Sequence, residues 1–384
     1  MTASALLDTP RRTLGPALAA GAGLAAAVGV GRFAYTPLLP AMVDANRIDA
    51  HDGALIAAAN YAGYLAGAVL LARRPNLNSR MSFRVSAGAL VASEALVALP
   101  GPTLIPAILR LIAGVASAVI FVGCAGAIAR LGGHGAGIAF GGVGFGIALT
   151  GLLALAARPM LTWQGLWLGA AELTAVLLLP ALRLDIHGIR TTEVVRADRP
   201  SRAWRALFVA YCLEGVGYIV IGTFLVAAVG AHNAAVGSAM WVIVGAAAAP
   251  AVLWGLVARR WSPATALVLA LLAQCAAAAL LAGSRTTWTA IIAAALFGGT
   301  FMGITMLAIR LGTELTGHRA AAILTAGYGA GQMLGPLVVA PVIGDGYAMA
   351  FAIATAVLAV ATVAAVIVCL RLARSDTARQ LKRT

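Results

Sequence analysis

The sequence predicts an all-α integral membrane protein with twelve transmembrane helices. Hydrophobic residues make up 61% of the 384 residues and charged residues only 10%, whereas soluble domains are typically about 45–50% apolar and about 25% charged. The apolar residues form runs of about 20, the length that an α-helix needs to cross a bilayer core. The chain has a formal net charge of +14, but its basic residues lie almost wholly in short segments between these runs. This distribution is typical of membrane topology and excludes nucleic-acid binding as the main function.

Each apolar run defines one expected span. The first run follows Arg11 and Arg12, as the core of a secretory signal peptide follows a basic segment, but it is far longer than a signal core of about 7–15 residues. We therefore expect it to be retained as the first helix. The expected spans are residues 16–43, 53–72, 81–99, 103–129, 138–157, 161–183, 204–230, 236–258, 263–282, 288–309, 320–342 and 347–370.

The arginines and lysines predict the orientation of these spans. All but five of the 27 basic residues fall before the first span, after the last, in alternate connecting segments or, for Arg84, Arg183 and Arg205, at span ends next to those segments. Because Lys and Arg resist translocation, this asymmetry predicts that both termini are cytoplasmic. The five exceptions are Arg32 and Arg110 within spans, and Arg47, Arg158 and Arg285 on the other side.

The chain divides into two similar halves. Its longest hydrophilic stretch, residues 185–202, is the expected cytoplasmic central loop between an N-terminal six-helix bundle (1–184) and a C-terminal six-helix bundle with a basic tail (203–384). Three short patterns recur at an offset of 185 or 186 residues. Single matches arise by chance in a chain rich in Gly and Ala, but three at one offset predict two parallel six-helix repeats. The patterns are Ala72-Arg73-Arg74 and Ala258-Arg259-Arg260, Gly29-Val30-Gly31 and Gly215-Val216-Gly217, and the spaced glycines 142/144/146 and 327/329/331.

Arg32 is the most informative single residue, because it falls inside the first span within residues 29–40. An arginine at the centre of such a helix costs about 2.5–3.5 kcal/mol on insertion scales and usually faces a bundle interior or a wet cavity. Since the two halves are related, the first and seventh spans are counterparts that border a central cavity. Arg32 and Glu214 are therefore facing candidates for contact with substrate or proton, and a salt bridge that holds one conformation closed is the alternative.

Two other charged residues are candidates to pair. Glu94 and Arg110 lie at similar distances from the turn at residues 100–102, so an antiparallel hairpin places them at similar depth. Pairing offsets much of the cost of burying each charge, and an arginine beside a carboxylate tunes its protonation. A role in helix packing alone is the alternative.

Polar residues that share helix faces with these groups complete the candidate set, because polar groups inside spans are functional by default. Tyr35 follows Arg32, Tyr218 lies one turn after Glu214, and Asn60 and Tyr64 are four residues apart on the second span, as are Tyr328 and Gln332 on the eleventh. The candidate substrate-binding or proton-coupling residues are Arg32, Tyr35, Asn60, Tyr64, Glu94, Arg110, Glu172, Glu214, Tyr218, Tyr328 and Gln332.

Several function classes are not supported by the sequence. There is no Walker motif, and the glycine-rich stretches at 142–146 and 327–331 lie within apolar spans, so close helix contact is a better interpretation than a nucleotide loop. The four cysteines have no paired spacing, and no Cys/His cluster indicates zinc. The five histidines lie outside the spans or at their ends. We expect no metal, no cofactor and no enzymatic activity.

The chain resembles the major facilitator superfamily over its whole length, in its twelve spans, central loop and basic turns after the second and eighth spans. Arg110 and Gly114 resemble the fourth-helix motif of that superfamily. The glycine-rich fifth span resembles its antiporter motif but lacks the usual Gly-Pro pair, and the turn at 71–75 lacks the usual acidic residue. Three stretches are similar to the YbfB/YjiJ type: Gly-Val-Gly-Arg32-Phe-Ala-Tyr35-Thr-Pro-Leu-Leu-Pro, Ala59-Asn60-Tyr61-Ala62-Gly63-Tyr64-Leu65-Ala66-Gly67 and Glu214-Gly215-Val216-Gly217-Tyr218.

This resemblance implies a secondary active transporter that moves a small organic solute across the bacterial cytoplasmic membrane by alternating access, as a monomer in the lipid bilayer and coupled to protons. Efflux is the favoured direction. Metabolite uptake is the main alternative, and a non-transporting receptor on the same fold is a further one. Substrate identity does not follow from the resemblance.

Overall fold

The computed structural model describes residues 9–128, 132–186, 201–231, 233–250, 253–284, 286–316, 319–343 and 346–381. Within these ranges the chain is built from helices joined by short connections, with no β-strand. The first half contains α2 (Thr9–Leu24), the π-helix η1 (Ala25–Val30), α3 (Tyr35–Asp44), α4 (Ala50–Arg73), the short η2 (Pro75–Leu77), α5 (Arg80–Val97), α6 (Leu104–Ile128), α7 (Gly132–Ala157) and α8 (Trp163–Ala181). The second half contains α9 (Arg202–Gly230), α10 (Ala234–Ala248), α11 (Leu253–Arg260), α12 (Pro263–Gly283), α13 (Thr287–Thr316), α14 (Arg319–Val339), the short η3 (Ala340–Val342) and α15 (Ala348–Leu381).

Helices occupy all twelve of the ranges expected to span a membrane, which confirms the fold class. In the described part of the chain, 10 helices are long and apolar enough to cross a membrane, the first running through α2, η1 and α3 as Leu14–Asp44. Helices α10 and α11 are bent by 51° and raise this number to 11 if they form one span. The third expected span is α5, which carries three charged residues, Arg80, Arg84 and Glu94, and is therefore less apolar than the others.

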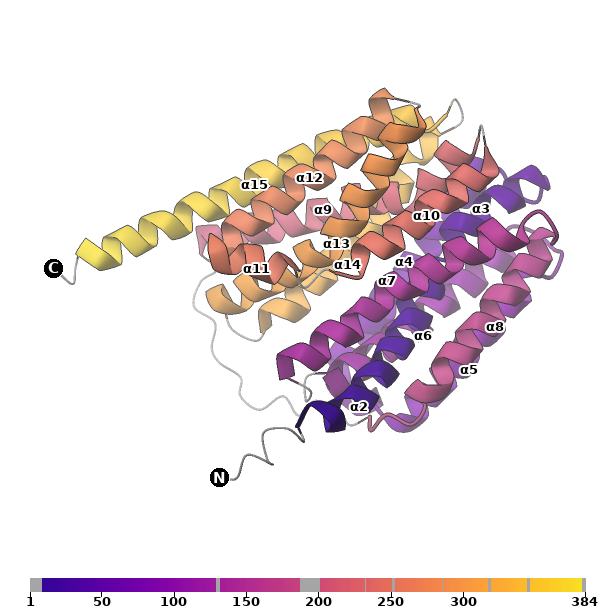
Figure 1. Cartoon of the computed structure of the whole chain (residues 1–384), viewed down its shortest axis with the longest axis horizontal. Helices are drawn as coiled ribbons and strands as arrows, with labels where there is room; N and C mark the ends of the chain where they lie inside the picture. Colours follow the sequence, from indigo (N-terminus) through magenta and orange to yellow (C-terminus); the bar gives the residue numbers. More distant parts are fainter. Residues whose placement is uncertain are drawn as a thin grey trace.

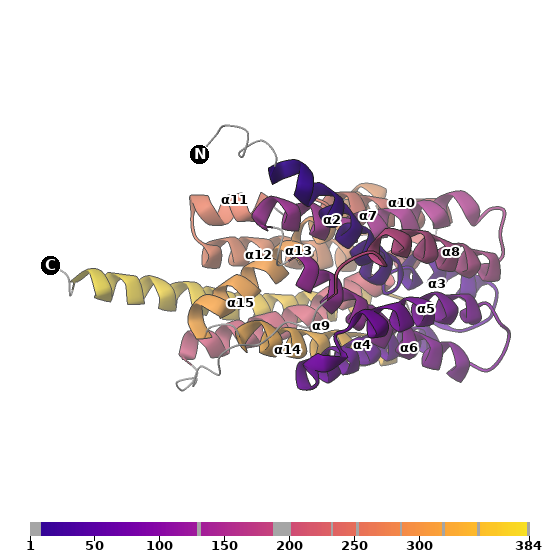
Figure 2. The ribbon, with the colours of Figure 1, turned by 90° about the horizontal axis from the view of Figure 1, so that it is seen from below.

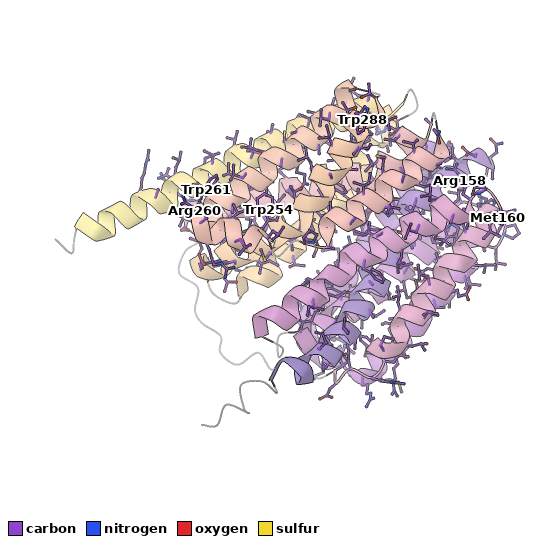
Figure 3. The ribbon with its side chains drawn as sticks, viewed as in Figure 1. Arg158, Met160, Trp254, Arg260, Trp261 and Trp288 are labelled. Atoms are coloured by element: carbon purple, nitrogen blue, oxygen red, sulfur yellow. The ribbon has the colours of Figure 1, made fainter. Side chains whose placement is uncertain are left out.

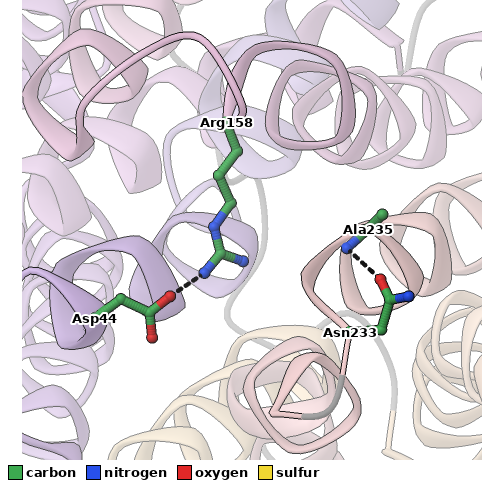
Figure 4. A network of polar contacts seen from close by, with 4 residues as sticks. All are labelled: Asp44, Arg158, Asn233 and Ala235. Carbon is green, nitrogen blue, oxygen red and sulfur yellow. Dashed lines mark hydrogen bonds and ion pairs between the residues drawn. The ribbon is translucent and has the colours of Figure 1, made fainter.

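Polar residues in the connections determine where many helices begin. Each of them accepts a hydrogen bond from a backbone N–H in the first turn, which has no partner within the helix. Figure 4 shows one example, in which Asn233 accepts from the N–H of Ala235 at the start of α10. The other capping residues are Asp49 before α4, Ser79 before α5, Thr162 before α8, Ser201 before α9 and Ser262 before α12.

The helices form two groups that follow the two halves of the sequence (Figure 1). Within the first group α4 packs on α6 and α2 packs on α7, and within the second α9 packs on α14 and α15. The groups meet where α7 contacts α10, α4 contacts α14 and α3 contacts α9. The central loop proposed for residues 185–202 lies mainly outside the described residues, because 187–200 are not among them. The boundaries of the two bundles stay a prediction.

The two ends of the molecule differ in charge. The start of α2 and the end of α15 lie at the same end (Figures 1 and 2). We call this the basic end, because Arg73, Arg202 and Arg260 lie there, where α4 ends, α9 begins and α11 ends. At the opposite end, Arg158 after α7 forms a 2.5 Å ion pair with Asp44 at the end of α3 (Figure 4).

Two exposed tryptophans mark both ends of the second half. Figure 3 shows Trp261 at the basic end and Trp288 near the opposite end. Their exposed fractions are 58% and 76%. Tryptophan is enriched at both water–membrane boundaries, so this placement fits a molecule that lies across a bilayer between these two levels.

Glycines bring the helices of the first half into close contact. A Cβ added at Gly142 would lie 2.1 Å from the carbonyl oxygen of Gly21, and a Cβ at Gly146 would lie 2.4 Å from that of Ala25. Small residues four apart let helix backbones approach in this way. The glycines of α7 therefore serve helix packing, as the sequence predicted for this stretch.

Candidate functional site

The first span is irregular around Arg32, although it remains one span from Leu14 to Asp44. After α2 the chain forms the π-helix η1, in which the N–H of Gly31 donates to the carbonyl of Ala26 at 2.7 Å. Residues 31–34 form a turn, and α3 begins at Tyr35. Pro37 contributes to the irregularity at residues 33–37, because it has no N–H to donate to Phe33 and its ring crowds the carbonyl four residues earlier. Arg32 thus lies in a turn within the span, where the sequence predicted a continuous helix.

Arg110 stabilises the turn at residues 31–34. Its Nη2 atom donates to the carbonyl of Arg32 at 3.0 Å, so a backbone oxygen exposed by the turn has a charged donor. Asn60 on α4 in turn donates through Nδ2 to the carbonyl of Arg110 at 2.8 Å. Broken helices are tolerated at membrane depth when neighbouring helices satisfy the freed backbone groups. Arg110 and Asn60 therefore stabilise the backbone at Arg32 without lining the cavity themselves.

The side chain of Arg32 connects the two halves. It is 5% exposed, and its Nη2 atom donates to Oε1 of Gln332 on α14 at 2.6 Å. Gln332 donates through Nε2 to the hydroxyl of Tyr218 on α9 at 3.3 Å. Residues from the first, seventh and eleventh spans are thereby joined in one chain of hydrogen bonds.

Aromatic rings surround the Arg32 guanidinium. Its Cζ atom is 4.0 Å from the ring centre of Tyr64 and 5.5 Å from those of Tyr61 and Phe33. Such contacts stabilise a desolvated cation by about 2 kcal/mol. Among the described side chains no carboxylate forms an ion pair with Arg32. The cation is therefore held by rings and by an amide, without a counter-ion.

A cavity of about 480 Å³ lies between the two halves with Arg32 in its wall. It extends to the basic end, where Arg310 lines it and pairs at 3.0 Å with Glu314, both about half exposed. Polar lining is sparse and most of the wall is aromatic or aliphatic. From the first half the principal lining residues are Arg32, Phe33, Tyr64, Phe121 and Phe140. From the second half they are Tyr211, Tyr218, Phe301, Tyr328 and Gln332.

Stacked rings form the wall of the cavity in the second half. Tyr211 and Tyr328 are nearly parallel, with ring centres 4.4 Å apart and an interplanar angle of 7°. Tyr218 stacks on Tyr328 at 5.5 Å and on Phe301 at 5.7 Å. Phe297 extends the stack at 5.7 Å from Phe301. The result is a row of nearly parallel rings, of which Tyr211, Tyr218, Phe301 and Tyr328 line the cavity.

The halves are in contact on the side of Arg32 away from the basic end. The hydroxyl of Thr36 donates to the carbonyl of Gly222 at 2.5 Å. The hydroxyls of Tyr61 and Thr223 share a hydrogen bond of 3.2 Å. Phe33 meets the ring of Trp241 edge to face at 6.0 Å. These contacts between the first, second, seventh and eighth spans close the cavity on that side.

Glu214 lies within the second half rather than in the cavity wall. One of its oxygens, Oε1, accepts from Nε2 of Gln274 on α12 at 2.9 Å, while Oε2 has no hydrogen-bond partner. Thr300 on α13 donates to Oε1 of Gln274 at 3.2 Å. The prediction that Glu214 faces Arg32 is therefore wrong, because Glu214 lies behind the tyrosine wall and points into its own bundle.

Glu94 and Arg110 do not form the ion pair that their similar depth suggested. The Nη2 atom of Arg110 donates to Arg32, and its Cζ atom lies 5.7 Å from the ring centre of Tyr35 and 5.5 Å from that of Trp167. Both oxygens of Glu94 are buried without a hydrogen-bond partner. Equal distance from a turn determines the depth of a residue but not the direction of its side chain. The side chain of Arg110 points to the carbonyl of Arg32 instead of to Glu94.

The candidates thus separate by position. Arg32, Tyr64, Tyr218, Tyr328 and Gln332 line the cavity. Asn60, Arg110, Glu94 and Glu214 are buried behind it. Tyr35 donates to the carbonyl of Gly53 at 3.0 Å, and Glu172 is exposed on the outer face of α8. Among the described residues, no group of three or more His, Cys, Asp or Glu side chains is placed to hold a metal ion.

Sequence reasoning missed part of the wall on α13. Phe297, Phe301 and Thr305 are spaced four residues apart and lie on one helix face, and the last two line the cavity. Their spacing of four residues places them on one helix face, so the sequence could have identified them as a set. Phe33 was overlooked because a phenylalanine within an apolar span does not differ from an ordinary packing residue.

Comparison with known proteins agrees with this architecture. The sequence matches the family described as uncharacterised MFS-type transporter YbfB over residues 24–370. Comparison with curated protein sequences found no match. A structure of a single-residue mutant of the nucleoside transporter NupG is similar with a TM-score of 0.72, 12% identity, and coverage of 91% of this chain and 99% of that one.

A second NupG structure is similar with a TM-score of 0.69 and 15% identity, covering 92% of this chain and 98% of the other. At these identities the likeness shows the fold alone. The family match covers most of the sequence and includes Arg32 and Gln332. The chain belongs to the major facilitator superfamily of membrane transporters, in the family described as uncharacterised MFS-type transporter YbfB.

Proposed function

We propose that this protein is a secondary active transporter that moves a small organic solute across the bacterial cytoplasmic membrane by alternating access. The observation that carries the proposal is the cavity between the halves, which has Arg32 in its wall, reaches the basic end and is closed beyond Arg32 by contacts between the halves. Transporters of this architecture bind solute near the midplane, between two halves that rock about the site.

The basic end faces the cytoplasm in this proposal. Arg73, Arg202 and Arg260 lie there, and positively charged segments are retained on the cytoplasmic side during insertion. The structure then corresponds to the inward-facing state. Outward opening requires the Thr36–Gly222 and Tyr61–Thr223 contacts to break and the basic ends of the two halves to approach.

Protons drive the transport in this proposal, and Glu214 carries the coupling proton. It is fully buried, has one oxygen without a partner and lies directly behind the tyrosines that line the cavity. Glu94 is the second candidate, in the other half. Both carboxylates lie outside the cavity wall, so solute and proton occupy separate sites. Export of the solute is the favoured direction in this proposal, and the aromatic and aliphatic wall suits amphipathic compounds.

Reconstituted vesicles test this function. The purified protein in proteoliposomes should catalyse counterflow of at least one member of a library of small organic solutes, and a pH gradient should drive its accumulation. If solutes bind but none moves across the membrane under either condition, the protein is a receptor on a transporter fold and the proposal is wrong. Vesicles of opposite orientation distinguish export from uptake.

The substitution Glu214→Gln tests the proton site. Glutamine keeps an oxygen for the hydrogen bond from Gln274 but cannot carry the proton. Accumulation driven by a pH gradient should be lost, while counterflow, which needs no net proton movement, should persist. Glu172→Gln is the matched control and should leave both activities unchanged, because Glu172 is exposed on the outer face of α8. If Glu214→Gln still accumulates solute, Glu94→Gln tests the second candidate.

A further inference from the structure

We infer that the solute is a flat aromatic carboxylate, with its carboxylate on Arg32 and its ring system against the stacked wall of Tyr218, Phe301 and Tyr328. This inference rests on the proposed function, since it takes the cavity to be the solute site. It names the chemical class that the wall of the cavity recognises.

Charge is the first argument. Among the described residues that line the cavity, two are charged, Arg32 and Arg310, and none is a carboxylate. Arg310 is paired with Glu314 at the basic end, whereas Arg32 has no ion-pair partner in the described part of the chain. A buried charge without a counter-ion carries a desolvation cost of several kcal/mol, and rings offset only part of it. An anionic solute supplies the missing counter-charge.

The geometry of Arg32 favours a carboxylate among anions. Gln332 occupies Nη2 through Oε1 at 2.6 Å, and the ring of Tyr64 lies 4.0 Å from Cζ on one face. These contacts hold the guanidinium plane in one orientation at the cavity wall. Because Nη2 already donates to Gln332, a solute carboxylate takes the remaining N–H groups of the guanidinium, and such charge-assisted hydrogen bonds are among the strongest in proteins.

Shape is the second argument. The rings of Tyr218 and Tyr328 are inclined by only 21° to one another, and those of Tyr218 and Phe301 by 18°. Glycines 141 and 329 add backbone without side chains to the wall. A solute ring that meets these parallel rings, in an offset or edge-to-face contact, gains a favourable interaction beyond area burial. A cavity of about 480 Å³ accommodates two or three fused rings.

The scarcity of other polar partners is the third argument. Thr305 lines the cavity, but its hydroxyl already donates to the carbonyl of Phe301 at 3.1 Å. Gln332 uses its amide on Arg32 and Tyr218. A solute rich in hydroxyl groups, such as a sugar or a nucleoside, would place most of its surface against apolar atoms, because little of the described lining is polar.

Binding to the wild-type protein in nanodiscs tests the class without any substitution. Isothermal titration compares 2-naphthoate with 2-naphthamide, which has the same rings but no charge, and with cyclohexanecarboxylate, which has the charge but no aromatic ring. We expect 2-naphthoate to bind about tenfold or more tightly than either, since a charge-assisted hydrogen bond contributes about 1.5–3 kcal/mol. Equal affinity for 2-naphthamide would overturn the assignment of an anion, and equal affinity for cyclohexanecarboxylate would overturn the aromatic part.

Substitution of Arg32 provides a second test of the inferred solute class. In Arg32→Gln the preference for 2-naphthoate over 2-naphthamide should disappear, and Arg32→Lys should restore it only in part, because lysine lacks the planar fork. Arg84→Gln on the exposed face of α5 is the matched control and should keep the preference. A preference that survives Arg32→Gln in folded protein would contradict the inference.

Transport separates this inference from the function on which it rests. If proteoliposomes transport uridine or another neutral solute while 2-naphthoate neither binds nor competes, the solute class is wrong and the transporter assignment stands. If 2-naphthoate binds through Arg32 but no solute crosses the membrane, the ligand class stands and the transport function is wrong.

Discussion

The first and seventh spans have similar sequences and different backbones. Gly29-Val30-Gly31 recurs as Gly215-Val216-Gly217 at an offset of 186 residues. In the first span this motif runs through the π-helix η1 into a turn, whereas in the seventh it lies inside the continuous helix α9. The duplicated motif therefore does not determine the local structure.

Proline accounts for the difference. The first span has Pro37 and Pro40, and the corresponding positions of α9 are Thr223 and Val226. Each proline removes a backbone hydrogen bond and crowds the preceding turn. The first span accordingly has a turn at residues 31–34, ahead of Pro37, whereas α9 is a regular helix.

The comparison also explains how two related halves form an asymmetric site. Arg32 and Tyr218 occupy corresponding positions, and both contact the side chain of Gln332. The corresponding residues Thr36 and Gly222 form a hydrogen bond with each other across the interface. One half thus supplies the cation and the other a row of aromatic rings, at the same depth.

Introducing a proline into α9 should produce the largest effect. Thr223→Pro places a proline in α9 at the position that corresponds to Pro37, and it should destabilise the protein by about 3 kcal/mol or more. The midpoint of thermal unfolding in detergent measures this loss. Thr223→Val is the matched control, because it removes the hydroxyl that contacts Tyr61 but keeps the helix. If Thr223→Pro were no less stable than Thr223→Val, proline would not explain the difference between the spans.

Filling the glycine contact of the first span should have the next largest effect. A Cβ at Gly29 would lie 2.6 Å from the Cα of Gly146, and overpacking of this kind costs about 1–3 kcal/mol. Gly29→Val should therefore lower the unfolding midpoint clearly. Gly88→Val on α5 is the control, because a Cβ there has no neighbour within 4 Å. Equal stability of the two variants would show that the contact between η1 and α7 is not tight.

Removing the side-chain amide of Gln332, which joins Arg32 of the first span to Tyr218 of the seventh, should impair transport more than stability. Gln332→Leu deletes the acceptor for Arg32 and the donor to Tyr218, so the guanidinium loses its fixed orientation. We expect counterflow to fall about tenfold, as loss of a hydrogen bond to a charged group predicts. Gln164→Leu near the start of α8, outside the cavity lining, should not change it. Unaltered counterflow by Gln332→Leu would mean that the orientation of Arg32 does not matter.

The smallest effect is expected from loss of the hydrogen bond between Thr36 and Gly222. Thr36→Val removes one hydrogen bond between the halves, which contributes about 0.5–1.5 kcal/mol, and should favour separation at the opposite end. Hydrogen–deuterium exchange of α3 and of the end of α9 should rise. Thr362→Val is the control, because that hydroxyl donates only within α15, to Leu358. Exchange that is the same in both variants would indicate that the Thr36 contact does not hold the halves together.

Much of the fold could be predicted because its determinants are local. Runs of about 20 apolar residues identify spans, and the positions of the arginines predict their direction. Half of the site could be predicted in the same way, since Arg32, Gln332 and the cavity tyrosines stand out as polar groups within apolar helices. The span of α5 is the least apolar, since it includes Arg80, Arg84 and Glu94, yet its position between two clear spans sufficed to predict it.

By itself, then, the sequence determined the membrane class, the twelve helical spans, the family and the identity of the unusual polar residues, because hydropathy and spacing along a helix depend on near neighbours. Only the tertiary structure decided which of those residues reach the cavity. Glu214 turns into its own bundle, Arg110 turns to the carbonyl of Arg32, and Phe301 enters the aromatic wall. Depth within a span follows from the sequence, but the direction of a side chain depends on helix rotation and on the break ahead of Pro37, and these are set by packing between distant segments.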